Sequence, residues 1–87
     1  MSKKNPVEVA RSLPVRFVGG DSVAFTMPNS VEVTHIPASL EKEAREQAGR
    51  ADGIYGSEEQ KAKAAWMSEL LKEMERIARE VVRSARA

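Results

Sequence analysis

The residues able to perform chemistry are few in this chain of 87 residues. It has one histidine, His35, and no cysteine. A nucleophilic triad needs a histidine poised as general base, and His35 lies beside Thr34 on an expected strand, which is typical of a packed or surface residue. A metal site needs several converging histidine and carboxylate ligands, and no spaced set surrounds His35. The sequence therefore predicts no catalytic residue, no metal site and no cofactor.

The carboxylates and glycines do not change this expectation. Most acidic residues have a basic neighbour at helical spacing, as in Glu75 and Arg79, which is typical of a solvated helix face and not of a tuned acid–base pair. Gly19 and Gly20 lead into an expected strand, whereas a phosphate-binding loop leads into a helix and carries a lysine. We expect a protein that is not an enzyme.

The dominant element is a long amphipathic helix over residues 57–86. Ser57 and Gln60 have the spacing of a capping box, and the helix would be ~45 Å long at ~1.5 Å per residue. Its apolar stripe is broad and repeats at alternating intervals of three and four, as in a coiled-coil seam. We expect the stripe to form a homodimer interface; the alternative is that it packs on the chain's own sheet. The expected interface residues are Trp66, Met67, Leu70, Met74, Ile77 and Val81.

The remaining pattern predicts a single small α+β domain over residues 1–87. Residues 1–14 are expected to form a partly extended arm, with an edge strand at 7–10 between two prolines. Residues 15–36 predict a three-stranded antiparallel meander with a hairpin turn at Gly19–Gly20. A short helix is expected over 38–48, ended by Gly49.

The glycine-rich loop at residues 49–56 contains two large side chains, Ile54 and Tyr55. We expect them to fold back on the core as anchors. The alternative is that they form an exposed contact for a partner.

Charge and the N-terminus bear on partners and location. The net charge is +1, and the N-terminal part is mildly basic through Lys3, Lys4, Arg11 and Arg16. These four are the candidate contacts to nucleic acid phosphates. No apolar run follows Met1, so we expect neither a signal peptide nor a membrane span, and a cytoplasmic protein.

Two stretches resemble known families of small dimeric regulators. The order of strand, Pro37, helix start, glycine loop and second helix resembles the ribbon–helix–helix repressors and antitoxins over about residues 31–80. That resemblance implies paired strands in a DNA groove, with Val31, Val33 and His35 facing the groove and Glu32, Thr34 and Ile36 facing inward. The stretch from Val15 to Pro28 is similar to the swapped-hairpin antitoxins, in which a Gly-x-Ser strand ends in Ile-Pro.

Together these features favour a non-enzymatic module that binds another protein, as an adaptor or an inhibitor of the kind found in mobile elements. The broad apolar stripe, an exposed sheet edge and the near-neutral charge are what such a module requires. The alternative is a dimeric DNA-binding transcriptional regulator or antitoxin.

Overall fold

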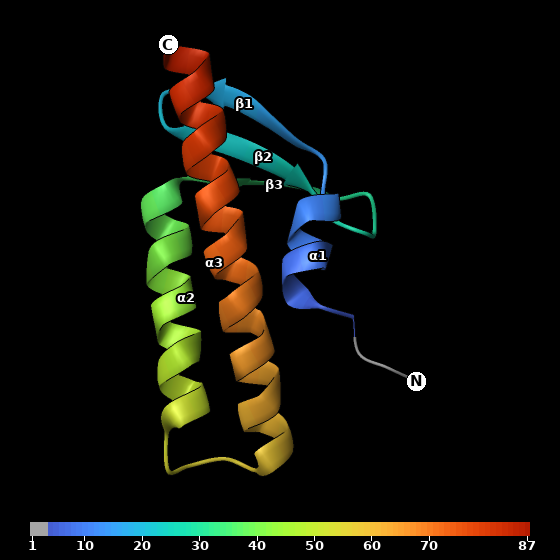
Figure 1. Ribbon diagram of the computed structural model, residues 1–87, viewed down its shortest axis with the longest axis vertical. Coiled ribbons are helices and arrows are strands. Elements are labelled where there is room, and N and C mark those ends of the chain that lie inside the picture. The colour runs from blue at the N-terminus through green and yellow to red at the C-terminus, as the bar shows by residue number, and fades with distance from the viewer. Residues whose placement is uncertain (1–3) are drawn as a thin grey trace.

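The computed structural model describes residues 4–87 and is an α+β fold in which helices cover one face of a small sheet (Figure 1). The elements in chain order are α1 (Pro6–Ser12), β1 (Val15–Gly19), β2 (Ser22–Thr26), β3 (Glu32–His35), α2 (Pro37–Asp52) and α3 (Glu58–Arg86). The predicted meander followed by a shorter and a longer helix is confirmed. Within the described residues, no helix is both long and apolar enough to cross a membrane.

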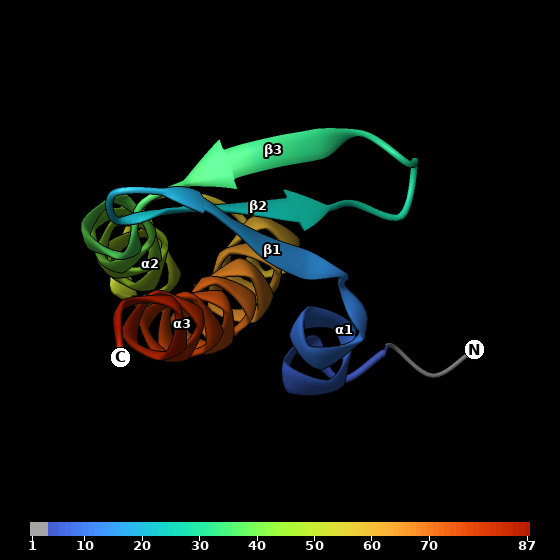
Figure 2. The same cartoon turned by 90° about the horizontal axis from the view of Figure 1, so that it is seen from above.

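The sheet has the order β1-β2-β3, with both neighbouring pairs antiparallel. The β1–β2 hairpin turns at Gly19 and Gly20, whose φ angles of 115° and 56° favour glycine. Val23 and Phe25 of the central strand are fully buried toward the helices. Figure 2 shows β3 at the sheet margin farthest from α1 and α3.

Helix α1 corrects the expectation of an extended arm and edge strand at the N-terminus. Pro6 occupies the first turn, where its missing N–H costs nothing. The Asn5 side chain caps the helix by accepting hydrogen bonds from the backbone N–H of Val7 at 2.8 Å and of Glu8 at 3.3 Å. The alternation of apolar residues at 7–10 was too short to distinguish a strand from a helix. In the structure the fully buried Ala10 packs α1 against the core.

Helix α2 is longer than predicted. It begins at Pro37 and continues through Gly49 to Asp52, with Gly53 as its C-cap. Gly49 therefore does not end it. A single glycine in a helix costs about 1 kcal/mol, and packing along α3 outweighs that cost.

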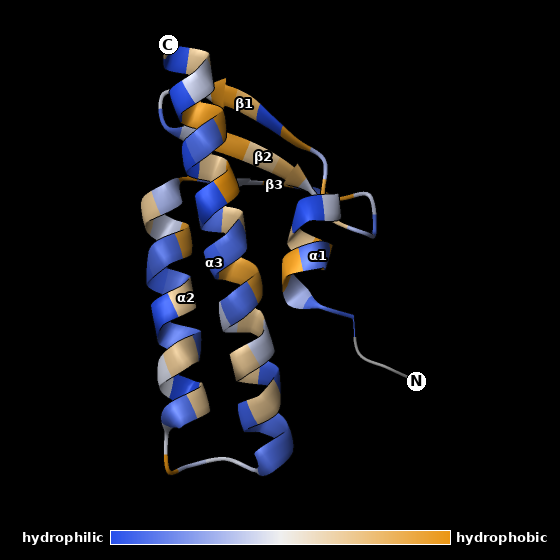
Figure 3. Ribbon diagram, in the orientation of Figure 1, coloured by the Kyte–Doolittle hydropathy of each residue, from blue (hydrophilic) through white to orange (hydrophobic). Residues whose placement is uncertain are grey.

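Helices α2 and α3 form a hairpin that extends well past the sheet, and the molecule measures 43 × 27 × 18 Å. Three small residues of the two helices, Ala44, Ala64 and Ala78, are buried. The Ser68 hydroxyl donates to the Ala44 carbonyl at 3.1 Å and ties the hairpin together. Figure 3 shows hydrophilic and apolar residues alternating along α2 and α3, and mainly apolar residues on β1 and β2.

Candidate partner-binding surfaces

The most exposed large apolar side chains lie in the loop that joins α2 to α3, at the end of the hairpin away from the sheet. Ile54 is 84% exposed and Tyr55 is 85% exposed. Figure 3 shows an apolar segment in this loop. The expectation that these residues anchor the loop to the core is wrong, because the hairpin carries the loop beyond the sheet. The alternative, an exposed position, is what the structure shows.

The loop around these two residues, which we call the tip loop (53–57), is hydrogen-bonded at its C-terminal end to the first turn of α3. The backbone N–H of Ser57 donates to the Gln60 side chain at 3.0 Å, and the backbone N–H of Gln60 donates to the Ser57 hydroxyl at 3.2 Å. This is the capping box that the sequence predicts. Gly56 has a φ of 97°, which an L side chain rarely adopts, and a Cβ there would lie 3.0 Å from Gln60 Oε1. The C-terminal end of the tip loop is therefore fixed to the first turn of α3.

The apolar stripe of α3 is covered by the chain itself. Leu70 and Met74 are 5% and 2% exposed in the core, so the expectation that they form a dimer seam is wrong. Trp66, Ile77 and Val81 are partly buried and pack against the same core. Helices α1 and α2 and the sheet cover the stripe that was expected to pack against a second copy. Met67 differs from the other stripe residues in being 37% exposed.

A groove beside Trp66 was not foreseen from the sequence. It has a volume of about 690 Å³ and runs between α1, the β2–β3 turn and α3, with Leu13, Met27 and Pro28 among its lining residues. The Trp66 indole N–H donates to the Lys4 carbonyl at 2.8 Å. One wall of the groove is α1, so the groove could have been predicted only if α1 had been. The sequence signal for α1 is Asn5 as a helix cap followed by Pro6 in the first turn.

The candidate nucleic acid contacts are separated, and two of them have carboxylate partners. Arg16 on β1 forms a bidentate ion pair with Glu32 on β3, and both N–O distances are 2.8 Å. The same contact lowers the pKa of Glu32. Arg11 donates to Glu73 at 2.8 Å. The Lys4 side chain is exposed and Lys3 lies outside the described residues.

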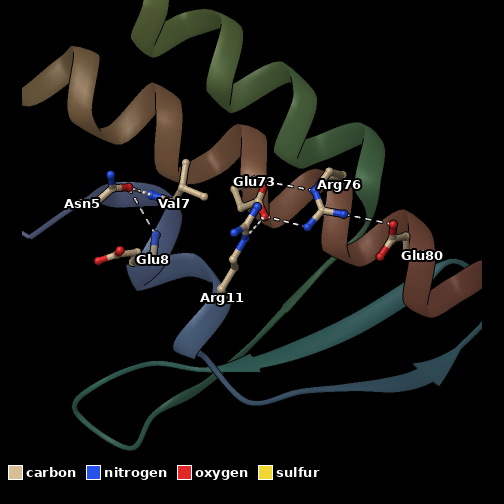
Figure 4. Close-up of polar contacts among 7 residues, drawn as sticks. All are labelled: Asn5, Val7, Glu8, Arg11, Glu73, Arg76 and Glu80. Carbon is tan, nitrogen blue, oxygen red and sulfur yellow. Dashed lines mark hydrogen bonds and ion pairs between the residues drawn. The ribbon is translucent and has the colours of Figure 1, made fainter.

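Glu73 is the centre of a small ion-pair network that attaches α1 to α3 (Figure 4). Its carboxylate accepts hydrogen bonds from Arg76 at 2.7 and 3.0 Å and from Arg11 at 2.8 Å. These contacts, Arg76 first and Arg11 second, lower the pKa of Glu73 to about 2 although its burial opposes the shift. Arg76 also reaches Glu80 at 3.0 Å. Each carboxylate of this network is paired with a guanidinium. We therefore call the network a structural clamp between α1 and α3.

His35 lies half-buried on the inner face of β3, and its ring makes an edge-to-face contact with the ring of Phe25 at a centroid distance of 6.1 Å. Among residues 4–87, no group of three histidine or acidic side chains is placed to hold a metal ion. The face assignment implied by the ribbon–helix–helix resemblance is wrong. Val33 pairs with the buried Phe25 and faces inward with His35, while Glu32 and Thr34 are exposed.

Comparison of the chain with protein-family models, with curated proteins and with solved structures gave no match.

Proposed function

We propose that the protein is a non-enzymatic binding module that attaches to another protein through its tip loop, as an adaptor or an inhibitor. The observation that carries the proposal is the exposure of Ile54 and Tyr55, at 84% and 85%, on a loop held by a capping box. The cytoplasm is the proposed location, in keeping with a sequence free of cysteine.

Contact with a partner would remove the apolar side chains of Ile54 and Tyr55 from water. Burial of a large apolar side chain contributes about 1.5–3 kcal/mol, so Ile54 and Tyr55 together offer a strong contact to an apolar pocket on a partner. Tyrosine is enriched at interface hot spots because it combines a large area with few rotatable bonds. The capping box at Ser57 and Gln60 fixes the C-terminal end of the loop, so fewer residues lose conformational freedom on binding.

The test is photo-crosslinking in the cells that make the protein, with a photoreactive phenylalanine analogue in place of Tyr55. The matched control carries the analogue in place of Phe17, which is 36% exposed on β1 and remote from the tip loop. We expect one discrete covalent adduct with another protein from position 55 and none of that mass from position 17. Absence of an adduct at position 55 would refute the proposal.

Affinity for the crosslinked partner, measured with purified proteins, supplies the second half of the test. Tyr55→Ala and Ile54→Ala should each weaken binding at least tenfold, because hot-spot truncations cost about 2 kcal/mol or more. Val18→Ala, at a 39% exposed position on β1, should leave affinity unchanged. Equal affinity for all three variants would show that the tip loop is not the contact.

The alternative, a dimeric DNA-binding regulator or antitoxin, has weaker support. A phosphate approaching Arg11 or Arg16 would have to displace Glu73 or Glu32. Fluorescence anisotropy with a labelled generic duplex separates the two functions. Binding that weakens steeply with added salt and with Arg16→Gln would favour the regulator, whereas a tip-loop module should not bind the duplex.

A further inference from the structure

A cavity at the end of the α2–α3 hairpin opposite the tip loop is lined by three arginines, and we call it the arginine cavity. It has a volume of about 370 Å³ and lies between the last turns of α3, the β1–β2 turn and the start of α2 (Figure 1). The three arginines are Arg79, Arg83 and Arg86 of α3. Residues three or four positions apart share one face of an α-helix, so the cavity collects three positive charges from a single face.

The three arginines differ in how far carboxylates of the chain already neutralise them. Arg79 pairs with one glutamate of α2 at 2.9 Å and with one of α3 at 2.7 Å. Arg86 pairs with Asp21 at 2.7 Å, and the two side chains are 64% and 65% exposed. Arg83 is exposed and forms no ion pair within residues 4–87. Asp21 is the one acidic residue in the lining, so three arginines and one aspartate leave an excess of two positive charges.

The start of α2, which forms another wall of the arginine cavity, lacks the usual polar cap. Its N-cap is Ile36, which offers no side-chain hydrogen bond, and its first turn contains no acidic residue. The N–H groups of Ser39 and Leu40 donate to the Ile36 carbonyl at 3.0 and 3.2 Å. The N–H of Ala38, which also lines the cavity, has no hydrogen-bond partner in the described part of the chain. Because the first N–H groups of a helix point outward along its positive end, α2 adds a donor to the arginine face.

We propose that the arginine cavity binds a phosphate monoester that carries an apolar body, either a small molecule or a phosphorylated side chain. A phosphate monoester has a charge of about −1.5 to −2 at pH 7, which matches the excess of positive charge in the lining. A guanidinium group donates two parallel hydrogen bonds to phosphate oxygens, and a helix N-terminus adds a third donor. Val82, 8% exposed, and Ile36, 41% exposed, supply an apolar wall for the body of the ligand. This site is independent of the tip loop, which lies at the far end of the hairpin (Figure 1).

The test is titration of the full chain with phenyl phosphate at low ionic strength, followed in nitrogen–proton correlation NMR spectra. We expect saturable shifts of the Ala38 backbone N–H and of the Arg83 side-chain Nε–H. Arg83→Gln should raise the dissociation constant about tenfold, because a charge-assisted hydrogen bond is lost. Asp21→Asn should lower the dissociation constant severalfold, because it frees Arg86 from its carboxylate partner. Both substituted side chains are exposed, and the same spectra show that the variants are folded.

Arg50→Gln is the matched control, because it removes the same charge from an exposed position in the last turn of α2, away from the cavity. It should bind phenyl phosphate like the wild type, and benzoate, with a single charge, should bind the wild type more weakly. A peptide with a central phosphotyrosine that binds more tightly than phenyl phosphate would assign the phosphate to a protein segment, and equal affinity would assign it to a small molecule. The proposal would be overturned by unmoved Ala38 and Arg83 signals, by equal affinities of wild type and Arg83→Gln, or by equally tight binding of benzoate. An equal loss in Arg50→Gln and Arg83→Gln would overturn it as well, since binding would then depend on overall charge.

Discussion

The clamp at Glu73 allows the docking of α1 to be tested through pH. Its pKa falls from an ordinary value of 4.5 to about 2, a difference equivalent to about 3–4 kcal/mol before solvent screening. The partners Arg11 and Arg76 have side chains that are 62% and 49% exposed, so solvent screens the pairs. We therefore expect Glu73→Gln to lower the free energy of unfolding by about 1–2 kcal/mol at pH 7.

The pH dependence follows from the direction of the shift. Above about pH 4.5 the Glu73 carboxylate is charged in both states, and its stabilisation is fully present. Between 4.5 and about 2 the unfolded chain binds a proton that the folded chain does not, so the stabilisation falls as the pH falls. The difference between wild type and Glu73→Gln should be less than half its neutral value near pH 3, by that linkage.

The assay is urea unfolding followed by circular dichroism, for both proteins, at neutral pH and at intervals down to pH 3. The difference between the two proteins is the quantity to follow, because Glu32 also has a lowered pKa and adds to the acid sensitivity of each. Arg11→Gln in both backgrounds completes a double-mutant cycle that isolates the pair between α1 and α3. A difference that does not change with pH would refute the reasoning.

Two further predictions concern the core and the tip loop. Met74→Ala, at a position 2% exposed, should lower the free energy of unfolding in urea by about 2–5 kcal/mol. Met67→Ala, at a position 37% exposed on the same stripe, should lower it far less. Equal losses would mean that the stripe is not buried as described. Gly56→Ala should cost about 1 kcal/mol or more, because φ is 97° and the new Cβ would meet Gln60 at 3.0 Å. Gly20→Ala, where φ is 56° and no atom lies within 4 Å, is its milder control, and a larger loss at Gly20 would contradict this account.

The candidate site was only partly readable from the sequence. Ile54 and Tyr55 stood out as apolar residues among glycines, but whether they reach the core depends on how far the helical hairpin extends past the sheet. The groove beside Trp66 could not be predicted because α1, one of its walls, was expected to be an extended arm.

The sequence alone was sufficient to predict the features that depend on residues close together in the chain. Ser57 and Gln60 determine the start of α3, and Gly19 with Gly20 determines the β1–β2 turn, because caps and turns depend on contacts between near neighbours. The apolar stripe of α3 likewise showed that a broad face must be covered. Only the tertiary structure showed which surface covers this face, because burial depends on segments that are distant in sequence. Leu70 and Met74 pack against the chain's own helices and sheet.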